Sequence, residues 1–257
     1  MSFVLDKNGD YLPVFGENTG GAESASYIPA DTTYTVKTDG TGDFTKLSDA
    51  VNFLNNKWSP YPVTISMGAG TFVENDKVEI IDTYHSGIPN IIIEGAGVDS
   101  TILQNTSTKN ALIFRNLRTS NIIVRNLTVE NTNATPPTIV LYAAGSRVLR
   151  VANVKLKNAQ YGLFAGVANS EIAIEGNLTI ENCGVGGFEV QNNSILTAGS
   201  TSTISFNTMP QAIHVYRQSK VIFMASTLSF TSVTTKASIP INTQTADGYI
   251  YTDSGTI

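Results

Sequence analysis

Cysteine, charge and long apolar runs are all scarce in this chain. A single cysteine, Cys183, occurs among 257 residues, so no intramolecular disulfide can form. Charged residues make up 14%, whereas about 25% is usual in a globular domain. The net charge of -5 argues against nucleic-acid binding, which needs a basic surface, and no stretch approaches the ~20 apolar residues of a membrane span. We therefore expect neither nucleic acid nor a membrane as a partner.

The first residues have neither a basic segment nor an apolar run of signal-peptide length. Together with the single cysteine, this predicts that the chain folds in a reducing cytoplasm without an export signal of its own. Asn, Thr and Ser supply the missing polarity. A surface of such neutral hydrogen-bonding side chains suits repetitive β structure and contact with glycans.

A repeat of about 25 residues runs through the middle of the chain and identifies a solenoid. Three segments align closely, SNIIVRNLTVEN over 120–131, SRVLRVANVKLKN over 146–158 and SEIAIEGNLTIEN over 170–182, and Ser194 and Ser219 open two weaker copies. Each copy has two short alternating strands joined by a polar corner. The sequence therefore predicts an all-β right-handed parallel β-helix, with about seven to eight coils after Tyr61. A β-sandwich, with strands every ~8–12 residues, does not predict this repeat.

Equivalent positions of stacked coils form columns about 4.8 Å apart. Three apolar pairs are expected to fill the interior: Leu127/Val129, Val154/Leu156 and Leu178/Ile180. One outward column alternates in charge: Glu130, Lys157 and Glu181. The closing asparagines predict a structural ladder bonded amide to amide: Asn105, Asn131, Asn158, Asn182 and Asn207. After Ser194 the pattern slips by one residue, so that Ile204 and Phe206 point inward and Asn207 no longer matches Asn182.

One convincing helix precedes the repeat, from Asp43 to about Asn56. Leu47, Val51 and Leu54 mark one apolar face, and Asp43 or Thr45 can cap the amino terminus. A solenoid needs a cap because an open first coil exposes its core and strand edges. We predict that this helix covers the first coil of a β-helix domain spanning 36–257.

Residues 1–35 form an amino-terminal arm with a different character. Residues 4–12 are typical of a hairpin around Asn8-Gly9, and 16–26 resemble a flexible linker. The arm is too apolar for a free tail and too small for a core. We expect its apolar residues to dock on another chain or, alternatively, to fold back on their own β-helix: Phe3, Val4, Leu5, Tyr11, Leu12, Val14 and Phe15.

Three segments resemble the opening of pectinesterases and related pectin-lyase-like β-helices. They are VKTDGTGDFTKLSDAV over 36–51, GAGTFVEN over 68–75 and IIIEGAGVDSTI over 91–102. In that family they build the cap and the first coils, and here the match covers about residues 36–131. The resemblance implies a pectinesterase-like β-helix scaffold, but it says little about activity.

The family's catalytic aspartates are missing. The resemblance places a Gln-Asp acid in a middle coil, where this chain has Gln160-Tyr161, and a second Asp further on, where 183–189 contain none. No aspartate occurs between Asp99 and Asp247, which also removes the Asp clusters of pectate lyases and polygalacturonases. We therefore predict no catalytic residues of this type and no pectinesterase activity.

Glycosidases need two carboxylates that face one cleft. Five acids lie in the aspartate-free stretch: Glu130, Glu171, Glu175, Glu181 and Glu189. A Glu175/Glu189 pair stays open as a hydrolytic site, but solvated outward positions are the favoured interpretation for both.

The histidines and the cysteine give weak signals. His85 falls in a loop, and His214 alternates outward from its apolar neighbours. Cys183 is interpreted as core filling, with a Cys183/His214 nucleophilic pair as the alternative. No cluster of metal ligands, phosphate loop or dinucleotide fingerprint occurs, so we expect no metal and no cofactor.

An enzyme-like scaffold without its acids leaves a rigid rod with a polar face. Such β-helices with an amino-terminal arm resemble bacteriophage tail spikes and tail fibres. The first hypothesis is a virion structural protein, a homotrimer assembled in the host cytoplasm. Its arm would bind other virion proteins, and its rod would attach without catalysis to a host surface polysaccharide. The alternatives are a capsid decoration protein and a carbohydrate-active esterase or depolymerase.

Overall fold

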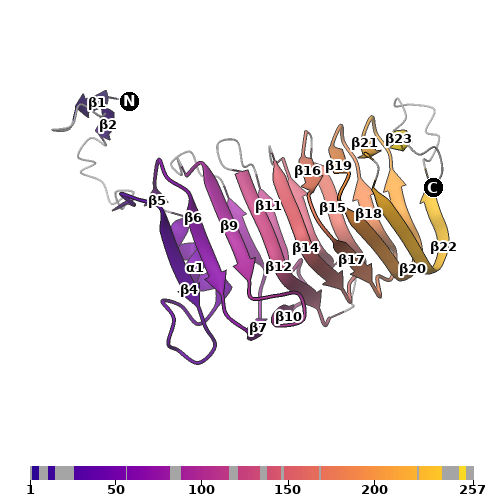
Figure 1. The fold of residues 1–257 in the computed structure, drawn as a ribbon, viewed down its shortest axis with the longest axis horizontal. Helices are drawn as coiled ribbons and strands as arrows, with labels where there is room; N and C mark the ends of the chain where they lie inside the picture. The colour runs from indigo at the N-terminus through magenta and orange to yellow at the C-terminus, as the bar shows by residue number, and fades with distance from the viewer. Residues whose placement is uncertain are drawn as a thin grey trace.

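The computed structural model describes residues 2–5, 11–14, 26–55, 57–81, 88–115, 121–133, 138–145, 148–167, 169–224, 226–238 and 249–252. Parallel strands stack coil upon coil into a rod, as predicted (Figure 1). The right-handed parallel β-helix is therefore confirmed, and it has about 6 turns. Seven to eight coils were expected. The first coils are longer than the repeat, because Val63 pairs with Ile91 and Ile91 with Ile122, steps of 28 and 31 residues.

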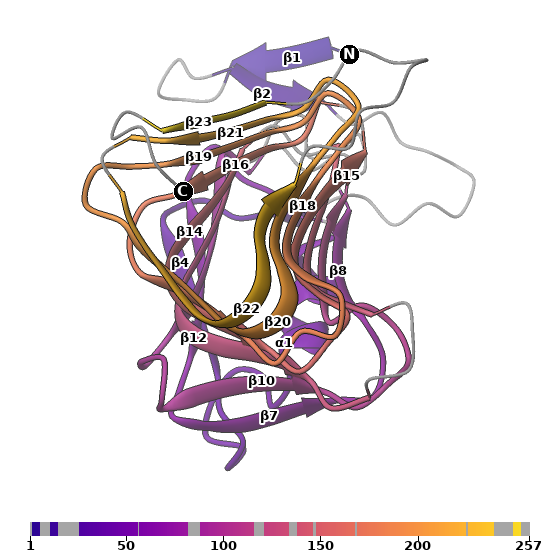
Figure 2. The same ribbon diagram turned by 90° about the vertical axis from the view of Figure 1, so that its right-hand side faces the viewer.

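Each coil contributes one strand to each of three faces (Figure 2). Face A contains β4 (Thr32–Val36), β6 (Val63–Met67), β9 (Asn90–Gly95), the first halves of β12 (Asn121–Asn131) and β14 (Leu149–Lys157), β16 (Glu171–Ile174), β19 (Ile195–Ala198), β21 (Lys220–Phe223) and β23 (Tyr249–Thr252). Face B contains β7 (Gly70–Glu74), β10 (Thr101–Asn105), the second halves of β12 and β14, β17 (Leu178–Glu181) and the first halves of β20 (Thr203–Val215) and β22 (Thr227–Ser238). Face C contains β8 (Val78–Ile81), β11 (Leu112–Arg115), β13 (Ile139–Ala144), β15 (Tyr161–Val167), β18 (Gly186–Val190) and the second halves of β20 and β22.

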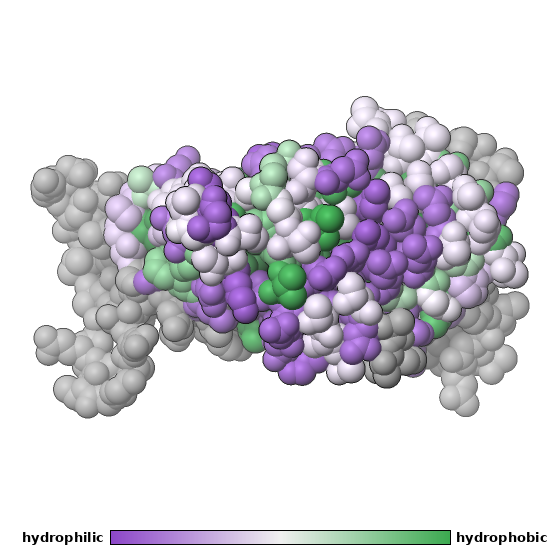
Figure 3. All heavy atoms as spheres, turned by 90° about the horizontal axis from the view of Figure 1, so that it is seen from below, coloured by the Kyte–Doolittle hydropathy of each residue, from purple (hydrophilic) through white to green (hydrophobic). Residues whose placement is uncertain are grey.

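The interior is a continuous apolar core along the rod. The predicted inward pairs are confirmed, since Leu127 stacks on Val154 and Val154 on Leu178, and all three are buried. Outward positions are polar or half-exposed. The side of the molecule seen in Figure 3 shows mainly hydrophilic and neutral residues, with hydrophobic ones in small areas. Alternation between core and solvent is thus what fixes the strand register.

Asparagine makes the corner between faces A and B. Asn126 and Asn153 have φ of 60° and 53°, and Asn tolerates this left-handed region better than most residues. Asn153 Nδ2 donates to Asn126 Oδ1 at 3.3 Å, one coil below. An amide-to-amide column was expected, but at the closing asparagines and not at Asn126 and Asn153.

The predicted ladder of closing asparagines is only partly correct. Asn105 and Asn131 are in register, yet their amides donate to main-chain carbonyls, of Asp76 at 2.7 Å and Lys109 at 2.7 Å. Their carbonyl oxygens accept from the N–H two residues on. These buried asparagines therefore stabilise turns and do not bond each other. The main-chain groups of the turn satisfy both the amide N–H and the carbonyl oxygen of each side chain, as burial requires.

The remaining asparagines behave differently. Asn182 Nδ2 donates to Asn158 Oδ1 at 3.4 Å, as a ladder requires. Asn207 pairs with Glu181 instead of Asn182, and Ile204 and Phe206 are buried. The predicted slip of one residue is therefore confirmed, and Asn207 does not belong to the ladder.

The cap is α1 (Leu47–Leu54), shorter than the predicted 43–56. Leu47, Val51 and Leu54 are buried against the first coil, as expected. Neither Asp43 nor Thr45 is the N-cap residue. That position is Lys46, whose side chain makes no capping hydrogen bond to the helix. Instead Glu74 from β7 accepts the Ser48 N–H at 3.0 Å, so the first coil itself supplies the cap.

The amino-terminal segment contains a hairpin, as predicted. β1 (Ser2–Leu5) pairs antiparallel with β2 (Tyr11–Val14), while Asn8-Gly9 and Phe15 lie outside the described residues. β4 pairs with β6, so face A begins at Thr32, before the boundary placed at 36. The short strands β3 (Ser26–Tyr27) and β5 (Lys57–Trp58) pair parallel, and the Tyr27 and Trp58 rings stack at 5.0 Å. No helix among the described residues is long and apolar enough to cross a membrane.

Candidate functional site

An outward column on face C gathers aromatic and ionisable side chains. Tyr142 pairs with Phe164, Phe164 with Glu189, and Glu189 with His214, so these four residues lie on successive coils. Tyr161 opens β15 beside them, and its ring packs edge-on against Phe164 at 5.7 Å. Because the coils stack at about 4.8 Å, side chains far apart in sequence meet on one surface.

Small residues make room for this arrangement. At the start of face C two consecutive residues point into the core, such as Gly162 with Leu163 and Gly187 with Phe188. A Cβ on Gly187 would lie 2.6 Å from the Phe206 ring and 2.7 Å from a main-chain oxygen. The next residues that point outward are Phe164 and Glu189, so these two consecutive inward positions set which side chains reach the surface.

The aromatic part of the column consists of three rings. Tyr142 and Phe164 pack at 5.3 Å with a perpendicular arrangement, and Tyr161 completes the group. The absence of a side chain at Gly166 allows this, because a Cβ there would lie 2.0 Å from the Phe164 ring. Phe164 is buried and Tyr142 half-buried, so the rings form a rigid apolar patch.

Glu189 is the unusual residue of face C, because only 5% of it is exposed although it points away from the core. Its Oε1 accepts the Tyr216 hydroxyl at 2.8 Å. His214 Nδ1 lies 3.8 Å from Oε2, and Tyr161 is close enough for the carboxylate to raise its pKa. Oε2 itself has no hydrogen-bond partner among the described residues. We call Tyr161, Glu189, His214 and Tyr216 the Glu189 cluster.

The cluster holds the carboxylate in its ionised form. Burial of Glu189 raises its pKa, but the interactions with His214, Tyr216 and Tyr161 outweigh this and leave the pKa below its usual value. Burial and the neighbouring carboxylate raise the pKa of Tyr161 to about 12, and they raise the pKa of Tyr216 too. Both phenols therefore stay protonated, and Tyr216 donates to an anionic carboxylate.

The turn that follows β20 borders the cluster. The His214 and Tyr216 rings lie 4.8 Å apart, and the Arg217 guanidinium lies over the Tyr216 ring at 5.3 Å. Arg217 Nη1 also donates to Asn192 Oδ1 at 3.2 Å and to Gln191 Oε1 at 3.5 Å. This cation is thus engaged by neighbours on the preceding coil and does not neutralise Glu189.

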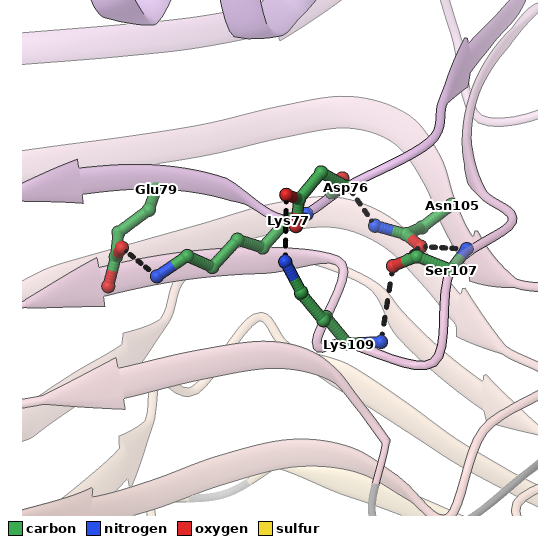
Figure 4. Close-up of polar contacts among 6 residues, drawn as sticks. All are labelled: Asp76, Lys77, Glu79, Asn105, Ser107 and Lys109. Atoms are coloured by element: carbon green, nitrogen blue, oxygen red, sulfur yellow. Dashed lines mark hydrogen bonds and ion pairs between the residues drawn. The ribbon is translucent and has the colours of Figure 1, made fainter.

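A second group of charges lies at the amino-terminal end of face C. Glu79 on β8 pairs with Lys77 and with Arg115 Nε, the latter at 2.9 Å. Close by, Lys109 Nζ binds Asp76 Oδ2 at 2.8 Å, and this contact holds the pKa of Asp76 below its usual value (Figure 4). These charges are paired, and Figure 4 shows Asp76 and Lys109 beside turns that Asn105 and Ser107 brace. We interpret this group as structural.

The acids of the aspartate-free stretch separate into different environments. Glu130, Lys157 and Glu181 form the predicted charged column, but Glu130 is buried and accepts from Gln104 at 2.6 Å and Lys157 at 3.1 Å. Glu171 and Glu175 are exposed, and Glu175 pairs with Arg150 at 3.4 Å.

The solvated position predicted for Glu189 is wrong, because aromatic neighbours cover it. Nor do Glu175 and Glu189 share a surface: Glu175 follows a face A strand, whereas Glu189 lies on face C. The open hydrolytic pair is therefore not assembled.

Cys183 fills the core, as interpreted, and burial raises the pKa of its thiol to about 12. His214 lies on the outer surface, so the two do not form a nucleophilic pair. His85 falls outside the described residues. Among the residues that the structure describes, no group of three or more His, Cys, Asp or Glu side chains is arranged to hold a metal ion.

The three-faced coils and the α1 cap define a parallel β-helix. Among solved structures, the chain is similar to a pectin methylesterase from carrot, with a TM-score of 0.51 and 13% identity over 87% of this chain and 83% of that one. It is also similar to a pectin methylesterase from Aspergillus niger, with a TM-score of 0.47 and 12% identity over 84% of this chain and 88% of that one. No protein-family model and no curated protein matches the chain. At such identity the likeness shows the fold alone.

The sequence analysis missed the Glu189 cluster. From the sequence, Tyr161 stood out as a substitution for an acid, while Glu189 was considered with Glu175 and His214 with Cys183. The usable signal was the coil period, since His214 follows Glu189 by 25 residues and the structure pairs them. Tyr216, two residues further on, has no signal of its own.

Proposed function

We propose that this protein is a non-catalytic saccharide-binding β-helix, and that its binding surface is face C around the Glu189 cluster. One observation carries the proposal: an ionised, nearly buried carboxylate on an outer face, beside a patch of aromatic rings. Sugar rings present C–H faces that pack on aromatic rings and hydroxyls that bond to carboxylates and phenols. Such a mixture of apolar and precisely placed polar groups is typical of ligand sites.

A column is suited to a chain-like ligand. Tyr142, Phe164, Glu189 and His214 follow one another along the rod axis. An extended polysaccharide that runs along this axis would meet rings first and the polar cluster next. The rigidity of the strands reduces the entropy lost on binding.

The test is binding of neutral tetrasaccharides to the full chain, measured by calorimetry. Tyr161→Ala removes a ring and a hydroxyl from the site and should weaken binding at least tenfold. Tyr251→Ala is the matched control, because Tyr251 is an exposed tyrosine on face A, and it should bind like the natural chain. Equal loss in both variants would contradict a site on face C.

An esterase or depolymerase on the same scaffold is the second candidate, and the approach of His214 to Glu189 favours it. The cluster contains a single carboxylate, however, whereas glycoside hydrolysis needs two. We expect no methanol release from methylated pectin. Release that His214→Ala abolishes would overturn the non-catalytic assignment.

We further propose that the chain serves a virion as a tail spike or tail fibre, with capsid decoration as the alternative. The hairpin of β1 and β2 and the cluster on a later part of the rod support a division between an anchoring end and a binding surface. Electron microscopy of labelled particles distinguishes the tail from the capsid. Absence of the chain from purified particles would contradict both.

A further inference from the structure

The Glu189 cluster has a defined hydrogen-bond polarity. Tyr216 donates its proton to Glu189 Oε1 at 2.8 Å. A phenol has only one proton, so once it is donated the oxygen can only accept from a ligand. The carboxylate is ionised and also only accepts.

His214 borders the same carboxylate. Its Nδ1 faces Glu189 Oε2 at 3.8 Å, which is longer than a hydrogen bond. Tyr216 therefore turns its donor towards Glu189 and leaves its lone pairs for a ligand.

We propose that Glu189 makes face C select saccharides that carry a free ammonium group, and that it excludes uronates. The inference rests on the proposed saccharide-binding function and names its ligand class. An ammonium group brings three donors and a positive charge to a surface that presents acceptors and a carboxylate. A uronate brings acceptors and a like charge to a surface that already has both. Arg217, the cation beside Tyr216, is engaged with Gln191 and Asn192.

Glu189 acts here as a specificity-determining residue through its neighbours. Its Oε2 is buried and has no hydrogen-bond partner among the described residues. An unpaired oxygen of this kind is unfavourable in the free protein, and because it is buried a bound cation would stabilise it through charge alone and not through a hydrogen bond. Neutral sugars gain the hydrogen bonds but not the charge interaction, so they should bind with intermediate affinity.

The experiment compares three tetrasaccharides with one β-1,4 backbone: cellotetraose, its 2-amino counterpart and its 6-carboxy counterpart. Calorimetry at pH 7 and low salt on the full chain should show the amino sugar binding at least tenfold more tightly than cellotetraose. The carboxy sugar should bind more weakly than either. Glu189→Gln keeps the shape but removes the charge, and it should reduce the amino preference below about twofold. Glu171→Gln, an equal charge change on face A, should leave the preference intact.

A second variant protects the test against misfolding. Tyr216→Phe keeps the Glu189 charge but removes one outward acceptor and the hydrogen bond that Tyr216 donates to Glu189 Oε1, and it should reduce the amino preference about threefold. Binding of cellotetraose without an amino preference, or a preference that Glu189→Gln and Tyr216→Phe retain, would overturn the inference and leave the proposed function standing. Failure of all three sugars to bind would instead contradict the proposed function.

Discussion

Asparagine takes two roles in the coils, and its abundance follows from both. Asn126, Asn153, Asn158 and Asn182 have positive φ and turn corners that most residues cannot. Asn105 and Asn131 are buried and bond main-chain groups of the turns. The spacing predicted that Asn105, Asn131, Asn158 and Asn182 recur once per coil. It could not distinguish the two roles, because the role of each asparagine depends on which hydrogen-bond partner the fold brings near it.

The Glu189 cluster predicts a specific response to acid. The pKa of Glu189 is lowered in the folded protein, whereas an unfolded Glu titrates near about 4.3. Its ionised form therefore stabilises the fold above about pH 4.3, and this contribution is lost as the pH falls through the folded pKa. Glu189→Gln lacks the contribution at every pH. The melting temperature of the natural chain should exceed that of Glu189→Gln at pH 7, and the difference should shrink towards pH 3. A constant difference would count against an ionised Glu189.

Gly187 tests how tightly the coils pack. A Cβ at this position would lie 2.7 Å from the Ala212 carbonyl oxygen, which belongs to the next coil and cannot move freely. Gly187→Ala should destabilise the protein by about 1–3 kcal/mol through overpacking. Gly199→Ala is the control, since its nearest neighbours would be at 3.7 and 3.9 Å. Urea unfolding measures both, and equal midpoints would refute the packing argument.

At the scale of elements, helix and strands were predictable to different degrees. The apolar face of α1 was evident, because Leu47, Val51 and Leu54 recur at helical spacing. Its start was not, because Asp43 bonds Thr35 instead of the helix and the cap comes from Glu74 on another element. Local sequence cannot reveal a partner that the fold brings from 26 residues away.

Glu74 gives the prediction at this scale. It is buried, and its carboxylate accepts from the first turn of α1, where the helix dipole favours a negative charge. Glu74→Ala should destabilise the protein by about 1–2 kcal/mol through the lost cap. Glu74→Gln keeps an acceptor and should cost about half as much, and Glu171→Ala, at an exposed site, should cost little. The three are compared by urea unfolding monitored by circular dichroism. If Glu74→Ala unfolds like Glu171→Ala, the cap is not formed in solution.

At the scale of the whole molecule, the three segments over 36–102 predicted the scaffold correctly. They lie in the cap and first coils, where the backbone path is most constrained. The functional surface was less predictable, since Tyr161, Glu189 and Tyr216 come from three coils. Only strand register joins them, and a register shift of one residue would have turned Glu189 towards the core.

Association through the arm is the prediction for the assembled protein. We expect a homotrimer, with an apparent mass three times the 27.5 kDa of the chain in sedimentation at micromolar concentration. Removal of residues 1–25 should abolish incorporation into particles and leave the rod folded, because β4 and face A lie beyond the deletion. A monomer in sedimentation would refute the trimer. Undiminished incorporation would refute the anchoring role.

Because the coils are stacked, the length of the rod and the contacts within the Glu189 cluster can change independently. The Glu189 cluster is confined to β15, β18 and β20 with the turn after it, whereas β8, β11 and β13 precede it on face C. Each coil adds about 4.8 Å, so the number of early coils sets the distance between the Glu189 cluster and the amino-terminal end of the rod. Gaining or losing one early coil would change that distance by about 4.8 Å without changing any contact within the cluster. Related proteins with more or fewer early coils would therefore place the same cluster at a different distance from the amino-terminal end.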